Sequence, residues 1–454
     1  MRRPILYIAI LGLLLLTACS FIASADESAD SSESTAQPSY EVTMETEIVE
    51  YEEYHITIHY PQTSNNKINQ TIIDYVNQRK AAFKKESYQS IQEHGKAKSH
   101  ELHIDFEVPH QGSSFFVVRF EETMDVGEPE LIHDQTVMNF GKKNGKLIQL
   151  DQLFKNDRDY VEHLTKLTKE KLRDDLSEEA YYHTEVQEVL KAVSTNYENI
   201  ALTGNGLEIY LNHAVATLPE KVVISQRSIK DLLNDSYSEA LMSEGIKQVS
   251  HKQHVDSSQE TKKIEKSEEE SNSESKRIAL TFDDGPHPKV TPNVLKILEK
   301  YEAKATFFMI GKRVQYFSET AKMVADQGHE IGNHTWDHPR LTRLSAEEVD
   351  NQIDRTQEII KEVTGVQPRM IRLPFGEVPS QFSSTQLKII PLDAHGENWQ
   401  EKEPEQLAQE LIENVESGDT LLLHDLQSTS VEVLELVLHE LNNKGYKIVK
   451  VSEL

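Results

Sequence analysis

Two adjacent carboxylates, Asp283 and Asp284, stand where a short apolar run ends and the chain turns. The run Ile278–Phe282 has the composition of a strand, and Gly285-Pro286 follows the two acids at once. We therefore expect both carboxylates at the carboxyl end of a strand, where parallel α/β folds place their catalytic groups. Asp-Gly is also a common turn signal, so this segment indicates a site only if other segments supply partners.

Two histidines four residues apart, His334 and His338, follow another short strand predicted at Glu330–Asn333. Two such imidazoles together with one carboxylate can hold a metal ion and leave positions open for water and substrate. With 19 histidines in 454 residues, a pair at this spacing also arises by chance. His55 and His59 form such a pair, and we expect them on a solvated sheet face.

Two further strand ends carry groups that suit hydrolysis. Arg372 ends a strand that starts at Met370, and the wholly apolar run Leu421–Leu423 ends at His424. A lone histidine in this position is more often a hydrogen-bonded core residue than a functional one. Next to a metal ion and a carboxylate base, however, it would be the natural general acid.

The elements that must position these groups alternate between strands and helices from residue 277 to residue 454. This alternation predicts an α/β fold, a distorted (β/α) barrel that forms the catalytic domain. The carboxyl ends of its strands lie on one face, so the four segments are expected to converge there.

The preceding half, residues 40–235, is expected to be an α+β accessory region that could divide into two subdomains. Tyr54–Tyr60 alternates like a strand, Ile68–Phe83 has helical spacing, and Gly204–Gly206 is a hairpin turn. We find no catalytic group of residues in it. Residues 236–276 are rich in Ser, Glu and Lys and poor in apolar residues, which is typical of a charged linker.

The N-terminus predicts export. A basic start precedes an apolar run from Ile5 to Leu16, which is short for a transmembrane helix and typical of a signal peptide over residues 1–25. Leu16–Cys19 is similar to a lipobox, in which Cys19 would carry the lipid, whereas Ala23–Ala25 is similar to an ordinary cleavage site. We favour the lipobox because Cys19 is the only cysteine in the chain. A flexible tether is expected over 26–39.

Composition excludes some classes of protein. The chain has 48 Lys and Arg against 76 Asp and Glu, a formal charge of −28, which argues against a nucleic-acid-binding surface. A single cysteine cannot form an intramolecular disulfide or a thiolate metal cluster. We expect a monomer.

The ordered segments Thr281–Pro286, His334–His338, Arg372–Gly376 and Leu422–Asp425 resemble the successive motifs of the polysaccharide deacetylases, the NodB-homology group of carbohydrate esterase family 4. With the signal, accessory half and linker, the chain resembles surface-attached Gram-positive peptidoglycan N-acetylglucosamine deacetylases. The resemblance implies a metal-dependent hydrolase that removes N-acetyl groups from N-acetylglucosamine in peptidoglycan. The alternatives are a deacetylase of chitin-like or O-acetylated glycans and a weakly active wall-binding surface protein.

The resemblance also implies a role for each matching residue. The catalytic residues would be the base Asp283, the acid His424 and Arg372, which orients the base; the metal ligands would be Asp284, His334 and His338. Zinc is the default ion for this ligand set, although other divalent ions would fit.

The substrate pocket would include a backbone N–H near Phe375, which holds the oxyanion, together with Leu422 and Trp399. Asn398 stands where the family usually has the acid that supports the catalytic histidine; an amide can orient an imidazole but does not stabilise its cation as a carboxylate does. The expected partners are a peptidoglycan or related N-acetylglucosamine polymer and, through lipid on Cys19, the outer face of the cell membrane. Without the lipid, the protein would be secreted or held in the cell wall.

Overall fold

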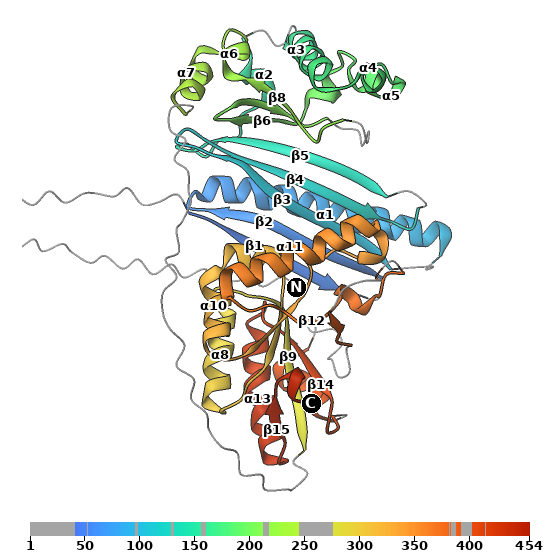
Figure 1. Cartoon of the computed structure of the whole chain (residues 1–454), viewed down its shortest axis with the longest axis vertical. Helices are drawn as coiled ribbons and strands as arrows, with labels where there is room; N and C mark the ends of the chain where they lie inside the picture. The colour runs from blue at the N-terminus through green and yellow to red at the C-terminus, as the bar shows by residue number, and fades with distance from the viewer. Residues whose placement is uncertain are drawn as a thin grey trace, which may run out of the picture. The chain divides into compact units, whose positions relative to one another are not determined.

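The computed structural model (Figure 1) describes residues 41–51, 53–95, 99–128, 131–155, 160–211, 218–244, 276–380, 382, 387–391, 402–413 and 415–454. Of these, Glu41–Leu454 form one compact unit. Within the described ranges, no helix is both long and apolar enough to cross a membrane. The expected signal peptide with Cys19, and also Asn398 and Trp399, lie outside them.

The accessory region begins with a five-stranded sheet in the order β1-β2-β3-β4-β5. Its strands are β1 (Val42–Glu50), β2 (Tyr54–Thr63), β3 (His100–Gln111), β4 (Phe115–Asp125) and β5 (Ile132–Gly141). Neighbouring strands are antiparallel except β2 and β3, which are parallel and joined by helix α1 (Asn66–His94). Ile56, Ile58 and Ile104 are fully buried, as are Ile68 and Ile72 of α1. The apolar face of the sheet therefore packs on α1, and the opposite face carries the polar residues of the alternating strands.

A second, three-stranded sheet follows, in the order β6-β7-β8. It consists of β6 (Ile200–Thr203), β7 (Gly206–Ile209) and β8 (Val222–Ser225), accompanied by α2 (Leu150–Leu153), α3 (Tyr160–Asp175), α4 (Glu178–Tyr181), α5 (Thr184–Val189), η1 (Ser194–Tyr197), α6 (Gln226–Ile229) and α7 (Asp235–Glu244). Helix α7 extends into the range expected to be linker. Its Leu241 is buried, and Tyr237 packs against the same core, so the boundary at 236 is too early. The segment has many polar residues, so its composition did not indicate that Tyr237 and Leu241 contact a core.

The remaining residues form a parallel sheet in the order β13-β12-β11-β10-β9-β14, with β15 also paired to β9. The strands are β9 (Arg277–Gly285), β10 (Thr306–Met309), β11 (Glu330–Asn333), β12 (Met370–Ile371), β13 (Lys388–Ile389), β14 (Thr420–His424) and β15 (Lys447–Val449). The predicted α/β class is confirmed. The barrel is incomplete, because no pairing among the described residues joins β13 to β14 or β15.

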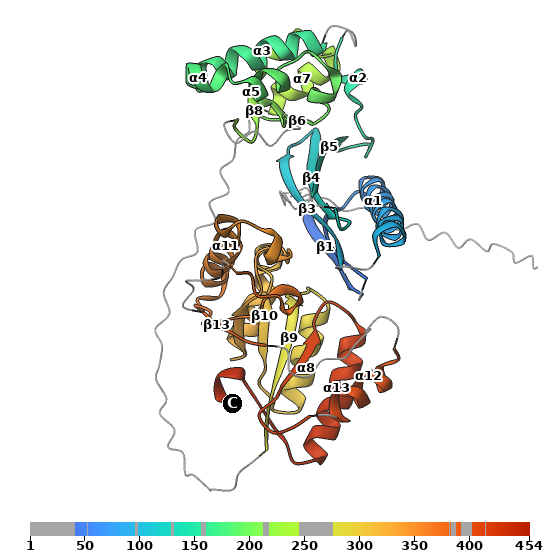
Figure 2. The ribbon, with the colours of Figure 1, turned by 90° about the vertical axis from the view of Figure 1, so that its right-hand side faces the viewer.

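Helices cover this sheet, and Figure 2 shows α8 and α13 beside β9. The helices are α8 (Val290–Lys300), α9 (Gly311–Tyr316), α10 (Ser318–Asp326), η2 (Leu341–Arg343), α11 (Ala346–Thr364), η3 (Pro374–Gly376), α12 (Pro404–Glu413), α13 (Thr429–Asn443) and η4 (Val451–Glu453). Leu280 and Phe282 of β9 are fully buried against apolar residues of α8 and α13. The central strand is thereby held rigidly, and its carboxyl end can present the two acids.

Candidate active site

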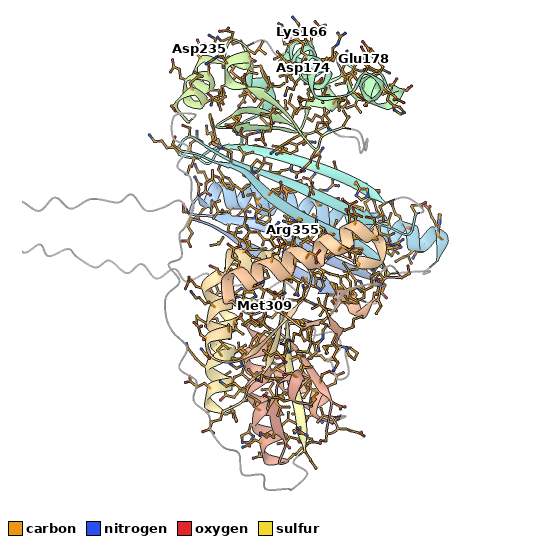
Figure 3. The ribbon with its side chains drawn as sticks, viewed as in Figure 1. Lys166, Asp174, Glu178, Asp235, Met309 and Arg355 are labelled. Carbon is orange, nitrogen blue, oxygen red and sulfur yellow. The ribbon has the colours of Figure 1, made fainter. Side chains whose placement is uncertain are left out.

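Strand β9 ends in a bulge that aims both carboxylates at one place. Phe282 pairs with Phe307 and Gly285 with Met309, so β9 has one residue more than β10 between the two pairs. Asp284, within this stretch, has a left-handed backbone with φ 70°. Adjacent residues of a regular strand point to opposite faces, and a bulge changes this direction locally. Met309, which pairs with Gly285 and is the last residue of β10, is labelled in Figure 3.

Asp284, His334 and His338 come together as a buried cluster whose candidate ligand atoms all lie within 4.8 Å of one another. Oδ1 of Asp284 lies 3.2 Å from Nε2 of His334 and 3.6 Å from Nε2 of His338. Among the described residues this oxygen makes no well-formed hydrogen bond, although it is buried. A buried carboxylate oxygen facing two imidazole nitrogens fits a divalent cation between them.

The electrostatics of the cluster suit metal binding. Burial opposes ionisation of Asp284, but the contact with His334 favours it, and the pKa of its carboxyl lies well below the usual range. Burial also lowers the pKa of His338 far below its ordinary value, so the imidazole stays neutral. An ionised carboxylate and a neutral imidazole are the protonation states that bind metals.

The second acid, Asp283, is paired with an arginine. Nη1 of Arg372, which follows β12, donates to Oδ1 of Asp283 over 2.7 Å and to Oγ1 of Thr281 over 2.8 Å. Both Asp283 and Arg372 are buried, and the guanidinium lies over the ring of Phe308 at 4.4 Å. The arginine holds the carboxylate in a fixed orientation.

The loop that carries the two histidines is held by helix α11. The amide of Trp336 donates to Oε1 of Gln352, and the amide of Thr335 donates to Oδ1 of Asn333, each over 2.8 Å. Arg355 of α11, labelled in Figure 3, lies over the indole ring of Trp336 at 3.9 Å. These contacts position the loop from the side of the catalytic domain.

Left-handed backbone is concentrated at this site. Five described residues other than glycine have positive φ, and four of them belong to the site: Asp284, Thr335, His338 and Phe375. Such conformations cost free energy and persist only where the surroundings enforce them, which is typical of functional sites. No residue type in the sequence signalled them.

The remaining predicted residues lie nearby where they are described. His424 is half-buried at the end of β14 and pairs in register with Asp283. Leu422, two residues earlier, is buried and points to the same face as His424. Phe375 packs against the His338 ring, with centroids 4.9 Å apart. Trp399 and Asn398 stay predictions, because they lie outside the described residues.

The prediction of a solvated face for His55 and His59 is wrong. His59 is fully buried, and its Nε2 donates to the carbonyl of Asp337 over 2.9 Å. His55 stacks on Phe375, with ring centroids 4.4 Å apart and planes 4° from parallel. Alternation placed both histidines on the polar face of β2, but it could not show that the catalytic domain covers this face.

Asp425, which the sequence did not single out, is buried directly beside the site. Its Oδ2 accepts a hydrogen bond from Oγ1 of Thr291, and Oδ1 has no partner among the described residues. A Cβ added at Gly285 would come within 2.1 Å of Oδ1. Burial raises the pKa of Asp425 to about 7, from an ordinary value of 3.8. The carboxyl therefore holds a proton in the folded protein that the unfolded chain releases.

We expect Asp425→Asn to remove a pH dependence of stability. Between pH 3.8 and about 7, the folded wild type binds more protons than the unfolded chain, so its free energy of unfolding falls by about 1.4 kcal/mol per pH unit from this group. Asparagine keeps an acceptor for Thr291 and does not titrate. Denaturation of both metal-free proteins at pH 5 and pH 8 gives their free energies of unfolding. From pH 5 to pH 8, the free energy of unfolding of the variant should rise relative to that of wild type. The same pH dependence in both proteins would contradict the raised pKa of Asp425.

A buried group of one carboxylate and two imidazoles beside a second carboxylate is compatible with metal-assisted hydrolysis. The comparisons identify the class of protein. The model of the polysaccharide deacetylase family matches residues 270–389. A relative that is 30% identical and aligns with 88% of this chain supports the same assignment. The chain belongs to the polysaccharide deacetylase family, and the predicted enzyme class is confirmed.

Two of the relatives that the chain resembles are named as peptidoglycan deacetylases. The chain is 30% identical over 413 residues to the peptidoglycan-N-acetylmuramic acid deacetylase PdaC of Bacillus subtilis. The alignment covers 88% of this chain and 85% of PdaC. It is 38% identical over 180 residues to the peptidoglycan-N-acetylglucosamine deacetylase PgdA of Listeria monocytogenes, 39% of each chain. A solved structure of PdaC is 38% identical, covering 40% of this chain and 90% of that chain, with a TM-score of 0.39.

Proposed function

We propose that the protein is a metal-dependent hydrolase that removes N-acetyl groups from amino sugars of peptidoglycan. The observation that carries this proposal is the buried group of Asp284, His334 and His338 beside the ion pair of Asp283 and Arg372. The names of the relatives supply the polymer, because PdaC and PgdA are both peptidoglycan deacetylases.

In this proposal Asp284, His334 and His338 hold the divalent ion. When bound, the ion polarises the carbonyl of the acetamido group and stabilises negative charge that develops on its oxygen. Asp283 accepts the proton of the attacking water, and Arg372 orients the carboxylate for this task. Zinc is the first candidate, and the same oxygen and nitrogen ligands would accept other divalent ions.

His424 donates a proton to the departing nitrogen. An amine leaves an amide only after protonation, so a hydrolase of this kind needs an acid as well as a base. The register of β14 with β9 supports the assignment, because it puts His424 directly beside Asp283. Leu422 would line the space for the acetyl methyl group, and the backbone N–H near Phe375 would hold the oxyanion. Trp399 and Asn398 would complete the pocket and orient His424.

Two sugars compete as the position of attack. N-acetylglucosamine is the sugar that the resemblance of the whole architecture implies and that PgdA's name specifies. N-acetylmuramic acid is favoured by the extent of the alignment, since PdaC matches 88% of this chain, well beyond the catalytic domain. The proposed place of action is outside the cell, with lipid on Cys19 holding the protein at the membrane surface.

Acetate release from purified peptidoglycan tests the function. We expect the zinc-loaded protein to release acetate, removal of the metal by a chelator to abolish release, and added zinc to restore it. Chitin oligomers and acetylated xylan serve as comparison substrates. Mass spectrometry of the muramidase digest then shows which sugar lost its acetyl group. Release that continues unchanged with chelator, or none from any glycan with zinc present, would contradict the proposal.

A further inference from the structure

The polar face of strands β2 and β3 in the accessory region lies against the loop that carries the metal-ligand histidines. His55, Thr57 and His59 alternate along β2, so they share one face. Thr57 pairs in register with His103 of β3, which places His103 on the same face. The opposite face of these strands is the apolar one that packs on α1. Sequence alternation thus produced a row of polar side chains, and folding placed it at the site.

Two histidines of this face converge on one carbonyl. Nε2 of His59 and Nε2 of His103 lie 2.9 Å and 3.0 Å from the backbone oxygen of Asp337. A carbonyl oxygen only accepts hydrogen bonds, so both nitrogens carry the hydrogen. Nδ1 of His59 then accepts from the hydroxyl of Thr46, which lies 2.9 Å away on β1. The carbonyl that these rings hold belongs to the residue directly before the ligand His338.

Thr57 reaches the ligand itself. Nε2 of His338 faces Asp284, whereas Nδ1 lies 3.4 Å from Oγ1 of Thr57, with both side chains buried. The other ligand has the same kind of support from its own domain, since Nδ1 of His334 lies 2.8 Å from the carbonyl of Arg372. Ligating histidines usually donate their second N–H to such a partner, which fixes the ring orientation.

The backbone of this loop needs such support. His338 has φ 61° and Thr335 has φ 66°, a conformation that is unfavourable for residues with a Cβ. Helix α11 holds one side of the loop through Gln352, which contacts the amide of Trp336. His59 and His103 hold the other side. Two independent sets of contacts therefore keep His338 aimed at the metal position.

We propose that the accessory region contributes supporting contacts to the metal centre. His59 and His103 hold the carbonyl of Asp337 by hydrogen bonds, and Thr57 orients the ring of His338. The accessory region then sets the affinity of the site for its divalent ion, in addition to any role in binding the wall. His59, His103 and Thr57 are positioning residues, because they act through the loop and do not touch the ion. The inference rests on the proposed metal site.

Zinc affinity of the full-length protein, measured by competition with a chromogenic chelator, tests this inference. We expect the double variant His59→Leu/His103→Leu to bind zinc about 10- to 100-fold more weakly than wild type, the range typical for loss of such supporting contacts. His59→Gln/His103→Gln should recover most of the affinity, because the glutamine amide can place an N–H donor near the position of Nε2. His133→Leu, at an exposed histidine of the same sheet, is the matched control and should bind zinc like wild type.

Thr57→Val covers the case in which the double leucine variant fails to fold, since it removes one hydroxyl at nearly constant volume. We expect it to weaken zinc binding several-fold, with an unchanged far-ultraviolet circular dichroism spectrum. Wild-type zinc affinity in Thr57→Val and in a folded double leucine variant would overturn the inference. If these variants released acetate faster than wild type and kept its zinc affinity, the inference would also be overturned. The accessory sheet would then limit the access of substrate to the site. If wild type itself binds no zinc, the proposed function fails first.

Discussion

Replacing Asp284 with asparagine is expected to lower acetate release by at least about a thousandfold, which corresponds to the several kcal/mol that a metal ion supplies to the transition state. The carboxylate is the only anionic member of the group of three, and it faces both imidazoles. An amide is neutral and therefore a weaker ligand for a divalent ion than a carboxylate. The zinc content of the purified variant, measured by atomic emission, should fall together with its activity.

Asp326→Asn provides the matched control for this substitution. Asp326 ends helix α10 in the same domain and is exposed, so the variant makes the same chemical change away from the site. It should keep wild-type zinc content and activity. If Asp284→Asn retained one zinc per chain and wild-type acetate release, Asp284 would not be a metal ligand.

The neighbouring substitution, Asp283→Asn, should separate the two adjacent acids. We expect it to lower kcat by about 10²- to 10⁴-fold, the usual contribution of a general base, while the zinc content stays close to one per chain. The reason is geometric: Oδ1 of Asp283 accepts a hydrogen bond from Arg372 over 2.7 Å, and Asp283 is not a member of the buried group of potential ligands. Asparagine fits the same space but cannot accept the proton of water.

The contrast between the two variants is the informative result. Loss of activity with metal retained assigns proton transfer to Asp283, and loss of both assigns coordination to Asp284. An Asp283→Asn protein that lost zinc as completely as Asp284→Asn would make both acids ligands. One that kept wild-type kcat would exclude Asp283 as the base.

Much of the catalytic domain could be predicted because its strands are buried and short. Apolar runs such as Leu421–Leu423 indicate strands of a parallel sheet, and β14 has nearly these limits, Thr420–His424. The predicted strand at Glu330–Asn333 is β11 without change. An apolar stripe at helical spacing, as in α11, indicates a helix in the same way. The short α9 was missed, since its six residues span less than two helical turns.

The accessory region was less predictable at its edges. Strand β1 was missed because its residues are mostly half-exposed and its pattern is weak. The core that buries Leu241 of α7 draws on residues far away in the sequence, so the composition of that segment alone suggested a linker. The second error concerns contacts between distant parts of the chain.

By itself, the sequence determined which residues are candidates for the chemistry and at which strand ends they stand, because residue type and period-two alternation are local properties. Only the tertiary structure decided how Asp283 and Asp284 came to share one site: a bulge opposite β10 and a left-handed backbone at Asp284 turn side chains that a regular strand would separate. It also decided that His59 and His103 lie against the loop between His334 and His338 and not in solvent. A strand's pattern shows which face is polar, but the partner of that face depends on packing between residues hundreds of positions apart.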